Sequence, residues 1–348
     1  MRPDDNELPG RIAVITGDPS LPDPTKQGAR YGPQDLALHQ KLRETLAALG
    51  KFEFEVIERH TGLFERLRSL EPELVVNFCD TGLFNRPEQE IHIATQLEIM
   101  GLPHTGAGPR AMLFCYDKQV VRLLAQALGI PVPAEQFVMA ADLQSVTVDA
   151  FPALIKPNTA DGSVGITQRA LVHDAREARD YLAWIAAELP GRDVLIQEFL
   201  PGTEYGLGII GNPAPGFDAL PMIEIDYSAL PDGLARIQSH EAKAQPGSAY
   251  WNAISSRPAT LPDARQRELA AACGTLFARL GLRDYGRFDF RTAADGSIRL
   301  MEVNPNPAWG FDATFATMAG FAGLDYAGLL ERLIATAWRR VKRGAAAR

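Results

Sequence analysis

The sequence has few cysteines, which argues against a fold that depends on disulfide bonds. Its three cysteines, Cys79, Cys115 and Cys273, lie far apart and form no pair with the spacing of a redox or metal-binding motif. This pattern is typical of reduced, buried side chains in a cytosolic protein. We therefore expect a cytoplasmic protein without a disulfide framework.

Long apolar runs and an excess of basic residues are also missing. No apolar run approaches the roughly 20 residues that a membrane-spanning helix needs, and residues 1–10 are too polar for a signal peptide. The net charge of -8 disfavours a nucleic-acid backbone or an anionic membrane as the main partner. We expect small-molecule partners, with no nucleic acid and no membrane.

What is present is typical of a globular protein with several domains. Hydrophobic residues make up 46% and charged residues 22% of the 348 residues, which is ordinary for a globular chain. This length exceeds that of one ordinary hydrophobic core and indicates two or three domains.

The first third of the chain alternates apolar strands with helices. We expect strands at residues 11–17, 52–57 and 74–78 and helices at residues 34–49 and 87–100. This order predicts a parallel sheet covered by helices. The loop 18–32, rich in Pro and Gly, follows the first strand, where ligand contacts are often found.

The later part of the chain mixes short strands with longer helices. We expect helices at residues 117–128, 174–189, 262–280 and 326–338, and strands at residues 153–156, 193–204 (running into a turn), 207–210 and 219–225. Cys273 belongs to the apolar stripe of the helix 262–280, so we interpret it as a core residue.

Residues 285–303 have the pattern of a β-hairpin that carries two carboxylates. Alternation places Glu302 and Asn304 on one face of their strand, and Asp289 can lie opposite them. Oxygen ligands of this kind suit Mg²⁺ that bridges nucleotide phosphates. The alternative is a pair of exposed charges. Both carboxylates stand within apolar runs, where a charge needs a partner, so we favour a site.

Two other segments have the pattern of a nucleotide site but are weak evidence alone. Residues 156–165 (KPNTADGSVG) can fold over phosphates with backbone N–H groups, beside the cation of Lys156. An ordinary hairpin loop with an exposed lysine is the alternative. Residues 193–204 can present backbone groups to an adenine and Glu204 to a ribose, or can simply connect two elements.

Taken in order, these motifs resemble the ATP-grasp ligases, in particular the D-alanine–D-alanine ligase-like branch. The resemblance covers nearly the whole chain. It is carried by the segments MGLPHTGAG and YDK (100–118), LIKPNTADGSVG (154–165), VLIQEFLPGTEY (194–205), EAK (241–243), and YGRFDF followed by MEVNPNP (285–307). No single segment is decisive, but their common order makes coincidence improbable.

The resemblance implies an α/β protein, α+β in its ATP-binding part, with the ATP-grasp fold. It implies an N-terminal parallel α/β domain at residues 1–107, a central ATP-grasp subdomain at 108–192 and a C-terminal ATP-grasp catalytic domain at 193–348. ATP would be clamped between the antiparallel sheets of the last two. A homodimer is expected on the same ground.

The resemblance also implies a role for particular residues, with ATP and Mg²⁺ (or Mn²⁺) as cofactors. The phosphates would be contacted by Lys118, Lys156 and Ser163, and the metal would be held by Asp289, Glu302 and Asn304. Adenosine would be held by Gln197, Met301, Glu204 and the backbone of Glu198–Leu200, including Glu198 and Leu200. At the reacting groups, Arg287 and Lys243 would act. Gln197 replaces the family's usual carboxylate, and its oxygen can still accept from adenine. Residues 239–249 would form a closing loop.

The substrate half departs from the D-alanine enzymes. The family's H-G-x-x-G-E-D-G stretch is replaced by residues 77–90, its E-R-E-V-S segment is absent, and Gly162 and Ala244 stand where a Ser and a Tyr are usual. We therefore expect ATP-dependent joining of a small amino-acid-like carboxylate to an amine, with a product other than D-alanyl-D-alanine. Other residues are expected to shape the substrate pocket: Trp309, Phe311, Asp312 and Arg30.

Three alternatives stay open at this point. A phosphotransferase (kinase) would keep the nucleotide residues but need no amine. A true D-alanine–D-alanine ligase would fit the family but not the rewritten substrate half. A non-catalytic nucleotide-binding scaffold would have no need of paired buried carboxylates. Arg287 beside the reacting centre favours the ligase.

Overall fold

The N-terminal part of the chain is a parallel sheet covered by helices, as predicted. The computed structural model describes residues 8–159, 164–239, 248–250 and 253–346. Its first sheet has the order β2-β1-β3, with every pair parallel. The strands are β1 (Arg11–Ile15), β2 (Glu53–Ile57) and β3 (Leu74–Asn77), with helices α1 (Pro33–Leu49), α2 (Leu63–Leu70) and α3 (Glu90–Ile99). β1 and β3 are runs of apolar residues because both faces of the sheet are covered.

Two eight-residue helices in this part were not predicted from the sequence. These are α2 and α4 (Pro109–Tyr116), which is followed directly by α5 (Lys118–Ala127). Each begins after a glycine, Gly62 or Gly108, and is only about two turns long. An apolar stripe of that length has too few repeats to be recognised by its period.

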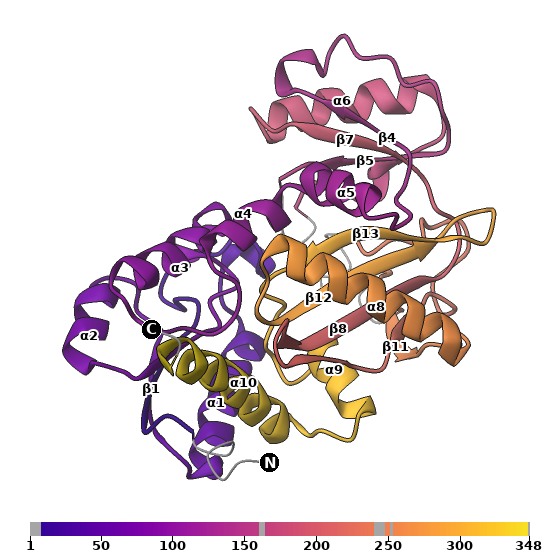
Figure 1. Cartoon of the computed structure of the whole chain (residues 1–348). Coiled ribbons are helices and arrows are strands. Elements are labelled where there is room, and N and C mark those ends of the chain that lie inside the picture. Colours follow the sequence, from indigo (N-terminus) through magenta and orange to yellow (C-terminus); the bar gives the residue numbers. More distant parts are fainter. Residues whose placement is uncertain (1–7, 160–163, 240–247, 251–252, 347–348) are drawn as a thin grey trace.

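The middle of the chain forms a four-stranded antiparallel sheet. Its order is β4-β7-β5-β6, with strands β4 (Glu135–Val138), β5 (Ala153–Pro157), β6 (Leu171–Val172) and β7 (Val194–Glu198). Helix α6 (Ala175–Glu188) packs on one face through Tyr181, Leu182 and Ile185 (Figure 1). The Asp174 carboxylate caps this helix by accepting from the N–H groups of Arg176 and Glu177.

A third, antiparallel sheet forms the body of the molecule. Its order is β11-β10-β8-β12-β13, with β9 paired to β8. The strands are β8 (Glu204–Asn212), β9 (Gly216–Ala219), β10 (Ile223–Asp226), β11 (Ser255–Pro258), β12 (Asp284–Thr292) and β13 (Ile298–Asn304). The strand expected at 219–225 is interrupted, because β9 ends at Ala219 and β10 begins at Ile223, and both pair with β8.

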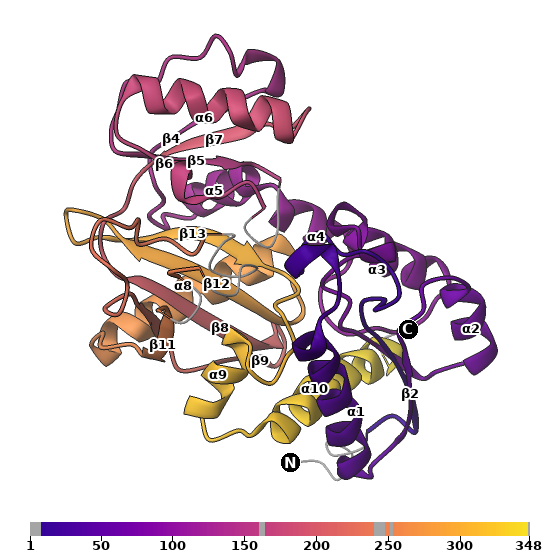
Figure 2. The ribbon, with the colours of Figure 1, turned by 180° about the vertical axis from the view of Figure 1, so that it is seen from behind.

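Helices cover both faces of this third sheet. α8 (Asp263–Leu280) packs on one face, with Cys273 only 1% exposed in its apolar stripe as predicted. α9 (Thr314–Phe321) and α10 (Tyr326–Ala346) lie on the other face (Figure 2). The glycines of β8 permit this approach, because a Cβ on Gly206 would lie 2.7 Å from the Met318 methyl carbon.

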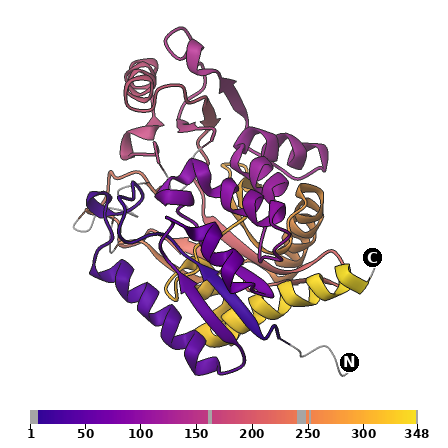
Figure 3. The same cartoon turned by 90° about the vertical axis from the view of Figure 1, so that its left-hand side faces the viewer.

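Helix α10 ties the third sheet to the N-terminal sheet. Its buried Leu333 and Ile334 share one hydrophobic cluster with Ile12 and Val14 of β1, and Figure 3 shows α10 in yellow beside the indigo N-terminal part. The architecture is therefore the expected one: a parallel N-terminal sheet and two antiparallel sheets that face a common space.

The boundaries 1–107, 108–192 and 193–348 remain a proposal. β7 begins at Val194 but pairs with β4 and β5, so a division that follows the sheets would place the last boundary after β7. Within the part of the chain that the structure describes, no helix combines the length and apolarity needed to cross a membrane.

Candidate active site

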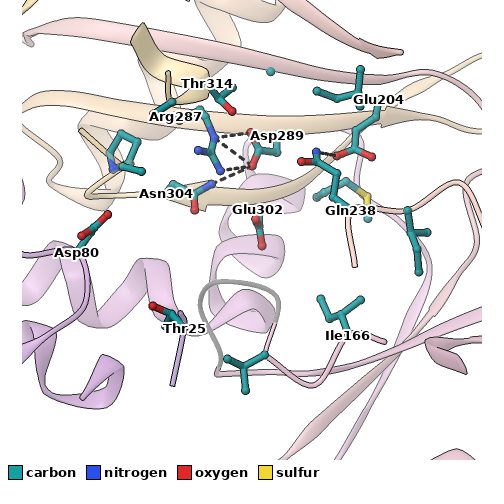
Figure 4. Close-up of a pocket in the computed structure, with 18 of the residues that line it drawn as sticks. Thr25, Asp80, Ile166, Glu204, Gln238, Arg287, Asp289, Glu302, Asn304 and Thr314 are labelled. Carbon is teal, nitrogen blue, oxygen red and sulfur yellow. Dashed lines mark hydrogen bonds and ion pairs between the residues drawn. The ribbon is translucent and has the colours of Figure 1, made fainter. Parts of the chain in front are cut away.

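A cavity of about 590 Å³ lies where the three parts of the chain meet. Its lining comes from the loops after β1 and β3, from the start of α5, from β5, and from the hairpin β12–β13. Figure 4 shows Asp289, Glu302 and Asn304 on one side of this space, and Thr25 and Asp80 on another. The predicted hairpin and nucleotide residues thus share a cavity with residues of the N-terminal part.

The hairpin brings its predicted residues together by register. Asp289 is paired with Glu302 and Arg287 with Asn304 across β12 and β13, and a bulge follows Asp289. Directly opposed residues of an antiparallel pair lie on the same face. All four side chains line the cavity, so the alternation in the sequence predicted their common face correctly.

The Asp289 carboxylate is the centre of this group. Arg287 donates to it from Nε to Oδ1 at 2.9 Å and from Nη2 to Oδ2 at 2.9 Å, and the Asn304 Nδ2 donates to Oδ2 at 2.9 Å. Burial nevertheless raises the pKa of Asp289, and the neighbouring carboxylates Glu302 and Glu204 add to that rise against the effect of Arg287. The site therefore contains more negative charge than its arginine offsets.

This excess charge is what a divalent cation would neutralise. Among the described residues no three carboxylates, imidazoles or thiols are grouped as a metal site, so a metal here would need the amide oxygen of Asn304 beside Asp289 and Glu302. Mg²⁺ favours few protein oxygens together with phosphate and water, and the donor set fits it. Because Arg287 and Asn304 donate to Asp289, a metal at this carboxylate would share it with these donors.

Two buried lysines lie opposite the hairpin carboxylates. Lys118 is 7% and Lys156 is 3% exposed, and both line the cavity. Burial lowers the pKa of Lys156 to about 8, and the nearby cation of Lys118 also lowers it, while Glu302 and Glu135 raise it. Two neighbouring buried ammonium groups favour an anionic ligand such as a polyphosphate.

The end of β5 holds Lys118 in place. Asn158 donates from Nδ2 to Oδ1 of Asp117 at 3.0 Å and accepts the N–H of Gln119 at 2.9 Å. Asp117 caps α5 by accepting from the N–H of Val120. One short polar network thus connects the strand that carries Lys156 to the helix that begins at Lys118.

Two of the residues expected to hold adenosine, Met301 and Glu204, line the cavity. Met301 lines the cavity together with Leu154 and Ile166. Gln197, Glu198 and Leu200 do not line it but belong to β7 and its exit, and Gln197 is the register partner of Leu154. Their contacts with adenine stay a prediction.

Glu204 lines the cavity at the start of β8 but already has several donors. Its Oε2 accepts from the Tyr227 hydroxyl at 2.7 Å and from Arg291 at 3.3 Å, and its Oε1 accepts from Gln238. A carboxylate has about four lone-pair sites, so contact with a ribose hydroxyl stays a prediction. Two predicted residues, Ser163 and Lys243, lie outside the described residues, as does most of the segment 239–249.

The substrate half contains residues that the sequence analysis missed. Lys26 follows β1 and Asp80 follows β3, and both line the cavity. Burial alone would lower the pKa of Lys26, but the carboxylates of Asp80, Asp35 and Asp23 raise it, and Asp35 lies 3.2 Å from its Nζ. The position of Asp80 just after a buried parallel strand was the available sequence signal.

Three of the expected substrate-pocket residues are wrong. Trp309 is partly buried and packs against the core, where its ring stacks on Phe78 with centroids 5.9 Å apart. Phe311 is 45% exposed and meets the edge of Tyr326, and Arg30 is exposed outside the cavity lining. Asp312 lines the cavity as expected, together with residues that were not predicted: Asn306 and Thr314.

Comparison with known proteins gives a consistent result. Residues 124–335 match the sequence profile described as D-ala D-ala ligase C-terminus. The chain is 26% identical over 319 residues to the D-alanine–D-alanine ligase of Desulforamulus reducens, covering 88% of this chain and 95% of that one. It is 32% identical over 247 residues to the vancomycin C-type resistance protein VanC1 of Enterococcus gallinarum, covering 69% of this chain and 67% of that one.

Solved structures share this fold. The D-alanine–D-alanine ligase from Bacillus anthracis complexed with ATP superposes with a TM-score of 0.70 at 20% identity, covering 96% of this chain and 99% of that one. The VanG D-Ala:D-Ser ligase from Enterococcus faecalis gives a TM-score of 0.67 at 18% identity, covering 94% and 99%.

Proposed function

Because this chain belongs to the D-alanine–D-alanine ligase family of ATP-grasp enzymes, we propose that its cavity joins a small amino acid to an amine at the expense of ATP. The family assigns the reaction class, an ATP-dependent ligation that forms an amide bond. The observation that supports it in this chain is the arrangement of Lys118 and Lys156 opposite Asp289 and Glu302 across one cavity. This arrangement suits a triphosphate held between cations and a metal site.

The proposed reaction has two steps. A substrate carboxylate oxygen attacks the γ-phosphorus of ATP, a new O–P bond forms, and ADP leaves as the bond to the β-phosphate oxygen breaks. The amine then attacks the acyl carbon, phosphate leaves, and the amine loses a proton. Both steps gather negative charge at one place, which cations must stabilise.

The residues of the chain have separate roles in this proposal. Lys118 and Lys156 bind the phosphates, with Ser163 and Lys243 as further candidates. Arg287 stabilises the oxyanion of the acyl transfer, a role for which its lining position and its fork of N–H donors are suited. Asp289, Glu302 and Asn304 hold Mg²⁺, which would supply Lewis-acid stabilisation of the transferring phosphoryl group.

The adenosine end is the apolar part of the cavity. We place the base between Met301 and Leu154, with Gln197 at its edge, the backbone of Glu198 and Leu200 beside it, and Glu204 near the ribose. These contacts are supported by position and by the family relationship.

The substrate end is expected to bind an α-amino acid by charge. On the N-terminal side, the described lining residues include one cation, Lys26, and three carboxylates act on it: Asp80, Asp35 and Asp23. This wall therefore favours a substrate ammonium group. We expect a product other than D-alanyl-D-alanine, since the family's substrate motifs are replaced here.

The decisive experiment is a screen of amino-acid pairs for ADP release, with mass spectrometry of the products. We expect ADP and phosphate to form with a carboxylate and an amine together, and a dipeptide or amide to appear. ADP release and a stable phosphorylated product without any amine would support the phosphotransferase instead. Absence of Mg-ATP binding would overturn the proposal.

A further inference from the structure

A row of three register partners runs across the second sheet toward the cavity. Glu135 on β4 pairs with Gln197 on β7, and Gln197 pairs with Leu154 on β5. Alternation puts Leu154 and Lys156 of β5 on one face, and both line the cavity. Opposed residues share a face, so Gln197 and Glu135 lie on this same face.

The two polar members of this row are almost completely buried. The Glu135 side chain is 1% exposed and Gln197 is 2% exposed. The Glu135 carboxylate accepts from the Nε of Arg122 through Oε1 and from the Nε2 of Gln197 through Oε2. Arg122, on α5, thus holds the carboxylate while the carboxylate holds the amide.

This contact determines which end of the Gln197 amide is presented to the cavity side. An ionised carboxylate only accepts hydrogen bonds, so the amide must turn its NH₂ group toward Glu135. The other end, Oε1, is then directed away from Glu135. It is buried and has no hydrogen-bond partner among the described residues, which is uncommon for a buried polar atom and points to a donor supplied by a ligand.

We propose that Glu135 is a positioning residue that makes Gln197 a permanent hydrogen-bond acceptor and thereby selects adenine over guanine. The apolar lining residues Leu154, Ile166 and Met301 suit a flat base. At the edge that Gln197 meets, adenine carries an amino group, a donor, whereas guanine carries a carbonyl oxygen. Oε1 pairs with the first and repels the second. The inference rests on the proposed function in that the cavity must bind a nucleotide.

A free glutamine could not make this distinction. Its amide can rotate and offer NH₂ to a carbonyl or oxygen to an amine, because both ends of the group are similar in size. A carboxylate side chain at position 197 would be an acceptor by itself, without help. In this chain the buried carboxylate of Glu135 fixes the Gln197 amide, so that the amide acts only as an acceptor, as a carboxylate would.

The test compares the binding of Mg-ATP and Mg-GTP by isothermal titration calorimetry in four proteins. The wild type should favour ATP by about 100-fold or more, since an unpaired acceptor facing a second acceptor is strongly rejected. Glu135→Gln should reduce this ratio by about tenfold, because a neutral side chain at position 135 donates as well as accepts and lets Gln197 rotate. The double variant E135Q/Q197E should restore it, since the amide introduced at position 135 can donate to the carboxylate introduced at position 197, and that carboxylate can only accept.

The matched control is Glu224→Gln. Glu224 is another buried carboxylate paired with an arginine, Arg257, but it lies outside the cavity lining. It should leave the ATP-to-GTP ratio unchanged. Thermal unfolding of each variant monitors the fold, and a structural loss alone would weaken ATP and GTP equally.

The outcomes separate this inference from the proposed function. The role of Glu135 would be overturned by an unchanged ATP-to-GTP ratio in Glu135→Gln, or by a folded double variant that does not regain the ratio. In either case, ADP release by the wild type would still support the ligase. A wild type that binds ATP and GTP equally would also overturn it. Loss of all nucleotide binding in the wild type would overturn both.

Discussion

The Lys118 ammonium reaches the Glu302 carboxylate across the cavity, with Nζ 3.8 Å from Oε2. Lys118 is the first residue of α5, and Glu302 stands on β13. The distance is longer than a direct hydrogen bond but too short to hold an atom between the two groups, so a phosphate oxygen or a metal ion would enter only as the two side-chain ends move apart. The nucleotide site is thus held partly preformed by the packing of α5 on β13.

Neutralising the hairpin carboxylates should abolish the metal-dependent step. We expect Asp289→Asn and Glu302→Gln each to lower kcat for ADP release by at least about 100-fold, since a ligand of the metal that offsets the developing charge is lost. Magnesium titrations of ADP release measure the effect, and the half-saturating concentration should rise in both variants. The control is Asp295→Asn in the exposed turn of the same hairpin, which should behave as the wild type. If both variants kept wild-type magnesium dependence, the metal would bind elsewhere.

Replacing Arg287 should slow chemistry more than binding. Arg287→Lys keeps the charge but loses the planar fork that now grips Asp289. We expect kcat to fall about 100-fold with little change in the KM for ATP, as for loss of an interaction made mainly in the transition state. Arg257→Lys, which alters a similar fork on the same sheet but outside the cavity, serves as the control. A raised KM with normal kcat would instead assign Arg287 to ground-state binding.

The local pattern of the hairpin made the grouping of its polar side chains predictable, whereas the N-terminal wall of the cavity was not predictable in this way. Asp289, Glu302 and Asn304 lie on two adjacent strands, so alternation alone sets their common face. Asp80 and Lys26 come from loops after different strands of a parallel sheet, and only the order of those strands brings them to one edge. Trp309 illustrates the opposite error. An aromatic residue after a strand fits a pocket or a core equally well, and tertiary packing against Phe78 decided for the core.

The pairing of Glu135 with Gln197 could not be predicted either. It depends on which strands are neighbours in the second sheet and on their register, and neither strand has a pattern that specifies its partner. The sequence could indicate that Gln197 departs from the family's usual carboxylate, but not that a buried carboxylate stands beside it.

Asp80 should set the affinity for the amino-acid substrate without affecting ATP. We expect Asp80→Asn to raise the KM for the amino acid at least tenfold, about the effect of losing a charged hydrogen-bond partner, at unchanged KM for ATP. Steady-state assays with each substrate varied in turn give the two constants. Glu88→Gln, an exposed neighbour outside the cavity lining, is the matched control. An equal rise in both constants would indicate a general disturbance of the N-terminal wall.

The lowered pKa of Lys156, about 8, should make ATP binding pH-dependent above neutrality. The folded-state pKa lies below the ordinary value of 10.5, so burial penalises the charged form, and that penalty is fully present below pH 8 and disappears toward pH 10.5. The free energy of unfolding without nucleotide should therefore increase through Lys156 as the pH rises through this window.

ATP needs the charged form of Lys156, so the affinity for ATP should fall above pH 8, by up to about tenfold per pH unit. Calorimetric titrations at about pH 7, 8 and 9 measure this affinity. The variant Lys156→Met should bind ATP weakly and with little pH dependence. The control is Lys51→Met, at a half-exposed lysine paired with Glu331, which should keep the wild-type pH profile. If the ATP affinity of Lys156→Met fell just as steeply above pH 8, a group other than Lys156 would be responsible for the pH dependence.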